Sequence, residues 1–266
     1  LSGNPLFPRR IMGHQPFRLS IWAMMLFSVT AYGFFFLLPI YLQQVHGYTT
    51  FQSGIILLPG ALFAGVATLL SGILSDRINP KTVAMVCLVG AAVASWRFHS
   101  DMDTPRELLY LDYICWGFFI GGAFAPITLL ALGTLKERDV ANGSTLVNVS
   151  RLVAGSIGTS YATSLLSIKK DSFYEALSAN LTWASPALDE LLSRFSLYAV
   201  NATGGFDPDT WNRLLFQAKQ ILLVRASSYA FEAVYEYLAL FPLAALVCVA
   251  LARSNSNHRE IKTPLH

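Results

Sequence analysis

The chain has 266 residues, of which 54% are apolar and only 13% are charged, with a formal net charge of +3. Soluble domains carry about 25% charged residues, so this chain has too few charges to cover a surface that faces water. Several apolar runs also exceed the roughly 18 residues that mark a membrane-spanning helix. The composition excludes an ordinary soluble domain and predicts an all-α integral membrane protein, for which we expect no nucleic-acid partner.

The apolar runs predict six transmembrane helices. A helix rises about 1.5 Å per residue, so about 20 residues cross a hydrocarbon core of about 30 Å. We expect a polar lead-in at residues 1–18 and a polar tail at 253–266. The predicted spans are residues 19–43, 51–75, 82–98, 108–135, 140–168 and 228–252.

The fifth and sixth spans are separated by a long polar segment, residues 169–227. Two stretches within it are typical of capped amphipathic helices. One is the Ser-Pro pair followed by residues 187–198, and the other is Asp207-Pro208-Asp209 followed by the residues up to Val224. We expect these helices to lie on the membrane surface or to form a small hairpin outside it.

The basic residues of the short loops predict the orientation. Cytoplasmic loops carry an excess of Lys and Arg, whereas long translocated segments tolerate charge and are not counted. The side of the two termini carries Arg9, Arg10, Arg18, Arg77, Lys81, Lys136, Arg138, Arg253, Arg259 and Lys262, and the opposite side carries only Arg97 and Arg106. The pattern places both termini in the cytoplasm and residues 169–227 outside.

A charged hinge follows the second span. It contains Gly72, Asp76, Arg77 and Lys81 and turns at an Asn-Pro pair. An acid at this position is suited to a helix N-terminus or a base at the cytoplasmic face. Arg77 and Lys81 favour keeping the turn in the cytoplasm. We therefore interpret the four residues as a conformational latch.

Polar groups at membrane depth are costly, and they are the candidates for function. Arg151 lies about three turns inside the fifth span and one turn from Asn148. It either lines a cavity and binds an anionic group or a carboxylate, or snorkels to the cytoplasmic interface. Glu236, two turns into the sixth span, is a candidate for proton coupling, whereas Glu232 is expected at the interface. Asp112 is expected at a solvated helix end.

Small residues predict where helices approach each other. Gly117 and Gly121 have the small-xxx-small spacing that lets two helix backbones come close. Gly155 and Gly158 give the fifth span a second small face. We expect these four glycines to lie in helix contacts.

The sequence contains no hydrolytic triad, Gly-rich phosphate loop or Cys/His cluster with metal-type spacing. We therefore expect no enzyme activity, cofactor or metal.

Three regions in order carry a family resemblance. Gly72-x-Leu74-x-Asp76-Arg77-x-x-x-Lys81 resembles the loop signature of the major facilitator superfamily. The region from Tyr41 to Pro59 is similar to the ninth and tenth helices of fourteen-span drug:proton antiporters of the EmrB/QacA type. Asn148-x-x-Arg151-x-x-x-Gly155-Ser-Ile-Gly158 resembles their thirteenth helix. The resemblance covers nearly the whole chain.

The resemblance implies that the chain is the C-terminal half, about helices nine to fourteen, of such an exporter in the inner membrane. The first residue is Leu rather than Met, which also suggests a piece of a longer protein. The implied partners are the N-terminal half, protons, an amphiphilic substrate, the lipid bilayer, a periplasmic membrane-fusion adaptor and an outer-membrane channel. The implied mechanism is alternating access, in which two bundles rock about a midplane cavity.

Other functions remain open at this point. Trp116 stands where the family often has a polar or basic residue, which leaves the substrate class open between drugs and a lipid, siderophore or sugar. A non-transporting six-helix structural or assembly protein is the alternative from a different class. A membrane enzyme is the weakest alternative, because no loop presents a catalytic constellation.

Overall fold

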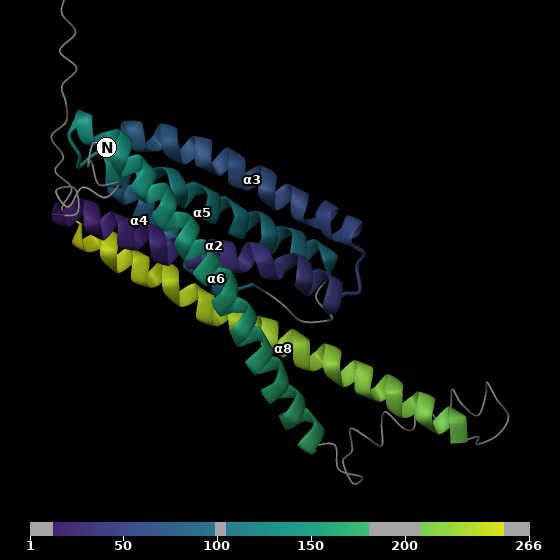
Figure 1. The fold of residues 1–266 in the computed structure, drawn as a ribbon. Helices are drawn as coiled ribbons and strands as arrows, with labels where there is room; N and C mark the ends of the chain where they lie inside the picture. Colours follow the sequence, from purple (N-terminus) through teal and green to yellow (C-terminus); the bar gives the residue numbers. More distant parts are fainter. Residues whose placement is uncertain (1–12, 99–104, 181–207, 253–266) are drawn as a thin grey trace, which may run out of the picture.

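A computed structural model of the chain describes residues 13–98, 105–180 and 208–252, and these residues form six α-helices (Figure 1). Their connections, where described, are short. The helices are α2 (Gln15–Gln44), α3 (Thr50–Arg77), α4 (Pro80–Trp96), α5 (Arg106–Leu132), α6 (Glu137–Asn180) and α8 (Pro208–Leu251).

Each of the six described helices overlaps one of the apolar runs of the sequence. By length and hydropathy, four of the described helices are suited to cross a membrane: α2, α3, α5 from Glu107, and α8 from Lys219. The other two differ for separate reasons. Helix α4 is apolar but has only 17 residues, and α6 is 44 residues long but carries many polar side chains. Such a polar helix is stable in a bilayer only where other helices or water cover its polar face.

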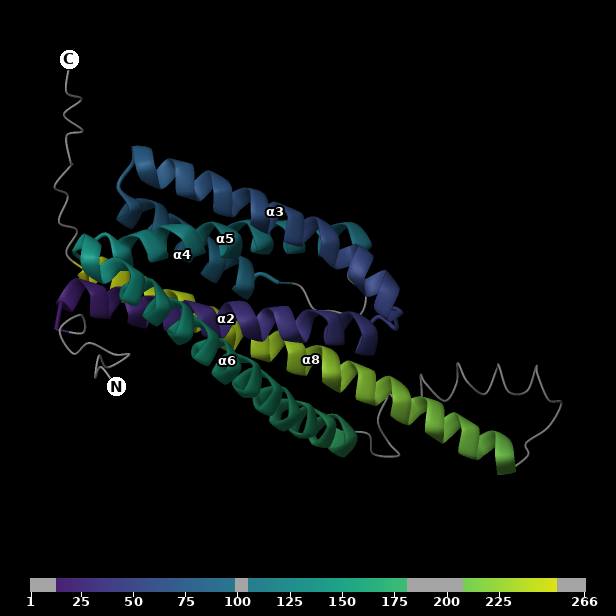
Figure 2. The ribbon, with the colours of Figure 1, turned by 45° about the horizontal axis from the view of Figure 1, so that its top comes forward.

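The polar segment predicted at residues 169–227 is helical at both of its described ends. Residues 169–180 continue α6, and the helix that begins at Pro208 runs unbroken into the last span. The sequence has no Gly or Pro between Ile168 and Asn180 or between Lys219 and Ser228, so nothing stops helix propagation. In Figures 1 and 2 the ends of α6 and α8 extend past the rest of the bundle. The helix predicted at 187–198 lies outside the described residues.

Local signals fix the turns at the two ends of α3. At its start, Thr49 and Gln52 form a reciprocal capping box, after Gly47 has turned the chain with φ of 68°. At its end, Asn79 caps α4 by accepting a hydrogen bond from the backbone N–H of Lys81 at 3.0 Å, with Pro80 as the first helical residue. The two short turns fold α3 back against its neighbours.

The six helices form two sequential triplets, and the first helix of each triplet packs mainly against helices of the other. The first triplet is α2, α3 and α4, and the second is α5, α6 and α8. Helix α2 packs mainly on α6 and α8, while α5 packs mainly on α3 and α4. Each leading helix therefore buries its surface against the other triplet, which joins the triplets into one bundle.

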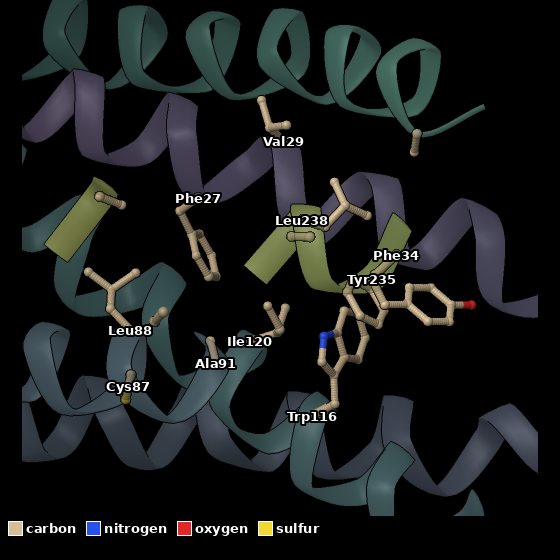
Figure 3. Close-up of a cluster of buried hydrophobic side chains, with 14 of the residues drawn as sticks. Phe27, Val29, Phe34, Cys87, Leu88, Ala91, Trp116, Ile120, Tyr235 and Leu238 are labelled. Carbon is tan, nitrogen blue, oxygen red and sulfur yellow. The ribbon is translucent and has the colours of Figure 1, made fainter. Parts of the chain in front are cut away.

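Aromatic rings fill the core of this bundle (Figure 3). The ring of Phe34 stacks against Trp116 at a centroid distance of 4.8 Å and against Tyr235 at 4.3 Å. Trp116 is fully buried, and its indole N–H donates to Ser95 Oγ at 3.2 Å. The stack joins α2, α5 and α8, with α4 bound through the serine.

Glycines bring α3 and α5 into backbone contact. A Cβ atom on Gly117 would overlap the carbonyl of Gly60, and one on Gly121 would overlap that of Ala64. Thr68 Oγ1 donates to the carbonyl oxygen of Gly121 at 2.8 Å. Such close approach is possible only without side chains at these positions.

We therefore expect Gly121→Ala to lower the midpoint of thermal unfolding of the detergent-purified protein. The added methyl group has no space, and overpacking costs about 1–3 kcal/mol. The control is Gly65→Ala on α3, where a Cβ would meet no atom within 4 Å. A helical Ala is more favourable than Gly, so this control should unfold at the wild-type temperature or higher. Equal behaviour of the two variants would contradict the proposed contact.

Candidate functional site

Arg151 lies where α2, α5 and α6 meet. It is on α6, and its guanidinium carbon lies 5.7 Å from the centroid of the Phe124 ring on α5. That ring packs edge-on against Phe27 of α2 at 4.9 Å. The cation therefore rests on an aromatic face, an attractive arrangement that gains strength when water is excluded.

The guanidinium of Arg151 is not fully satisfied. Its Nε atom is buried and has no hydrogen-bond partner among the described residues. A snorkelling arginine would carry this group to water, whereas here the Nε is shielded and the side chain is half-buried. Buried donors are nearly always paired, so the nitrogen points to a partner other than the residues that the structure describes. Asn148, one turn earlier on α6, is exposed and can share such a partner.

Glu236 lies elsewhere, so the structure does not bring it together with Arg151. Its side chain is exposed on α8, in a groove that Lys169 of α6 also lines. Lys169 and Arg151 are 18 residues apart on one helix, which corresponds to about 27 Å along its axis. Arg151 and Glu236 therefore belong to different sites in this bundle.

The hinge residues of α3 point in different directions. Gly72 faces α5, where a Cβ atom would meet Ala125 at an ordinary contact distance of 4.0 Å. Asp76 and Arg77 are exposed, and neither forms a hydrogen bond or an ion pair with any residue that the structure describes. These two charges are therefore free to meet something outside the bundle.

Lys81, by contrast, has partners within the chain. Its ammonium group donates to the backbone carbonyl oxygens of Ala250 and Ala252, both at 2.7 Å. These carbonyls end α8, where a cation also interacts favourably with the helix dipole. Lys81 thus fixes the α3–α4 turn to the end of the last helix.

Sequence reasoning missed two features near these sites. One is the buried Tyr235, whose hydroxyl has no hydrogen-bond partner among the described residues although it lies beside the aromatic stack. The other is Lys169, which the sequence placed at the start of the outer segment but which lies over the Tyr237 ring, 5.1 Å from its centroid. No signal in the sequence pointed to either feature, because the stacking of Tyr235 on Phe34 and the contact of Lys169 with Tyr237 both form between helices.

The described residues contain no group of three or more His, Cys, Asp or Glu side chains that could hold a metal ion. The candidate chemistry of this chain therefore rests on single charged groups at helix contacts.

A six-helix bundle with four helices long and apolar enough to cross a bilayer defines a multi-pass membrane protein. Residues 2–159 match the family model of the Major Facilitator Superfamily, which is more than half of the chain. The chain therefore belongs to this family of membrane transporters. The exchange of partners between the two triplets agrees with the three-plus-three repeats of these transporters.

Curated relatives in this family include proteins named for multidrug resistance. The chain is 30% identical over 69% of its length to the uncharacterized MFS-type transporter YhcA of Bacillus subtilis. It is 32% identical over 61% of its length to a multidrug resistance protein B homolog of Mycobacterium tuberculosis, and 24% identical over 85% to the multidrug export protein EmrB of Escherichia coli. These matches cover 35%, 31% and 45% of the relatives, so the chain spans less than half of their length.

Solved structures show the same fold. The chain superposes on a bacterial homolog of the human lysosomal transporter Spinster, in its inward-facing and occupied conformation, with a TM-score of 0.65 at 16% identity. The match covers 91% of this chain and 50% of that one. The six helices therefore correspond to about half of a complete transporter of this fold.

Proposed function

We propose that the chain is the C-terminal half, helices nine to fourteen, of a fourteen-span exporter that moves amphiphilic toxic compounds across the cytoplasmic membrane in exchange for protons. The single observation that carries the proposal is Arg151, a half-buried cation with an orphaned nitrogen at the junction of α2, α5 and α6. Such a group is costly in a membrane and is retained where it binds something. The multidrug exporters among the relatives supply the substrate class.

The missing half accounts for the exposed surfaces. Only 22% of the apolar window of α3 is buried in the bundle, compared with 67% for α2. In a two-bundle transporter part of such a surface packs against the opposite half, and the remainder faces lipid. Asp76 and Arg77 then meet partners in the N-terminal half and act as a latch at the cytoplasmic face. Arg151 and Asn148 line the cavity between the halves.

The remaining roles follow from the same proposal. Glu236 is the acid of this half placed to exchange protons, while the main coupling acids belong to the other half. Both ends of the chain lie in the cytoplasm, and the segment between α6 and α8 faces outward. The helix ends that extend past the bundle give a periplasmic adaptor a surface to contact (Figure 2).

The test is accumulation of ethidium in bacteria that lack their own exporters and express the full-length protein. Cells with the exporter should accumulate less dye than cells with an empty vector, and a protonophore should abolish the difference. A lipid analogue, a siderophore and a sugar tested in parallel separate the other substrate classes. Export of one of these without ethidium export would replace the drug proposal, and no transport of any compound would favour an assembly role.

A further inference from the structure

A groove of about 550 Å³ lies between α4, α6 and α8, away from Arg151. Apolar side chains form most of its wall, and two charged side chains of opposite sign complete it. Its lining includes Val93, Trp96, Lys169, Glu236, Tyr237 and Leu240. Trp96 and Leu240 are largely exposed, so the groove opens onto the outer surface of the bundle.

Contacts between the helices place the groove near one end of the bundle. Lys81, at the start of α4, touches the end of α8, whereas Trp96 is the last residue of α4. The two residues are 15 positions apart, which corresponds to about 23 Å along the helix axis. With the orientation proposed above, the groove lies in the outer half of the bilayer. Trp and Tyr side chains favour that boundary between hydrocarbon and headgroups.

The two charges of the groove are not used within the bundle. No ion pair joins Lys169 to Glu236, or either of them to another residue within the described ranges. The ammonium group of Lys169 lies over the ring of Tyr237. Uncompensated charges are costly beside hydrocarbon, so a ligand with both a negative and a positive group would satisfy both.

We propose that the groove binds one phospholipid with a zwitterionic headgroup and a primary ammonium, that is, a phosphatidylethanolamine. Its phosphate pairs with Lys169, its ammonium donates hydrogen bonds to Glu236, and one acyl chain lies along Val93, Leu240 and Leu243. Charge-assisted hydrogen bonds of this kind are the strong ones. A quaternary choline headgroup has no N–H to donate, and a glycerol headgroup has no positive charge.

The measurement is lipid binding to the detergent-purified full-length protein by native mass spectrometry. Phosphatidylethanolamine, phosphatidylcholine and phosphatidylglycerol with identical acyl chains are titrated in turn. The wild-type protein should prefer phosphatidylethanolamine by about tenfold, the value of roughly one charge-assisted hydrogen bond. Glu236→Gln should remove this preference, and Lys169→Gln should weaken binding of all three phospholipids.

The matched controls are Glu232→Gln on α8 and Lys170→Gln on α6, since neither residue lines the groove. Both should keep the wild-type preference. Equal wild-type affinity for the three lipids, a preference that survives Glu236→Gln, or binding of ethidium but no phospholipid would each overturn the proposal. The inference takes its orientation from the proposed function, but binding is measured without transport, so its failure would leave the proposed export function standing.

Discussion

Export by the full-length protein is expected to fall by about 10- to 100-fold in the Arg151→Ala variant. Hydrogen bonds to a charged group contribute about 1.5–3 kcal/mol, which corresponds to this range. The guanidinium rests on Phe124, and its buried Nε has no hydrogen-bond partner among the described residues, so a bound substrate or carboxylate would lose its partner in this variant. The measurement is the initial rate of ethidium export from preloaded cells.

Two further variants separate binding from folding. Arg151→Lys keeps the charge but loses the planar fork, so it should export at an intermediate rate. Arg138→Ala removes an exposed arginine at the start of α6, whose Nε lies 3.8 Å from Asp139, and should export like the wild type. Membrane levels of all variants are compared by immunoblot. Wild-type export by Arg151→Ala at a normal membrane level would remove Arg151 from the mechanism.

The Asp76→Asn variant should also lose most of its export, by about tenfold, without becoming less stable. Asp76 is exposed and has no partner in the described part of the bundle, so its charge stabilises nothing there. A latch to the opposite half would lose an interaction of about 1–2 kcal/mol, which is close to tenfold in rate or population. Export rate and the thermal unfolding midpoint are measured on the same preparations.

Asp139→Asn in the first turn of α6 is the matched control, because this partly exposed acid lies beside the exposed Arg138. A surface pair of this kind contributes little, so the control should transport normally. Asp76→Glu keeps the charge and should retain part of the export. Normal export by Asp76→Asn would show that the hinge acid is no latch, and lost stability with lost export would show a structural role instead.

Apolar runs were sufficient to predict the helices of this bundle, because a membrane helix is marked by length and hydropathy within one segment. The turn between α3 and α4 was also predictable, since Asn79 and Pro80 carry the capping signal locally. Where helices stop was harder to predict. Residues 169–180 are polar, but they lack breakers and remain helical beyond the predicted span.

Which side chains meet between helices could not be predicted from the sequence. The stack of Trp116, Phe34 and Tyr235 joins three helices whose relative rotation no local pattern specifies. For the same reason Glu236 was grouped with Arg151 as a transport residue, although the two occupy different sites. Lys81 binds backbone carbonyls near the other end of the chain, and a backbone acceptor leaves no side-chain motif in the sequence by which it could be predicted.

The most direct test of the proposed mechanism is proton movement in liposomes that contain the purified full-length protein. The liposomes enclose a pH-sensitive dye, and a pH gradient is imposed across their membrane. Addition of ethidium should accelerate proton flow through the wild-type protein, and the proton gradient should drive ethidium in the opposite direction. Both fluxes should fall by about 10- to 100-fold in the Arg151→Ala variant. Ethidium transport that ignores the proton gradient, or a proton leak that ignores ethidium, would contradict a drug:proton exporter.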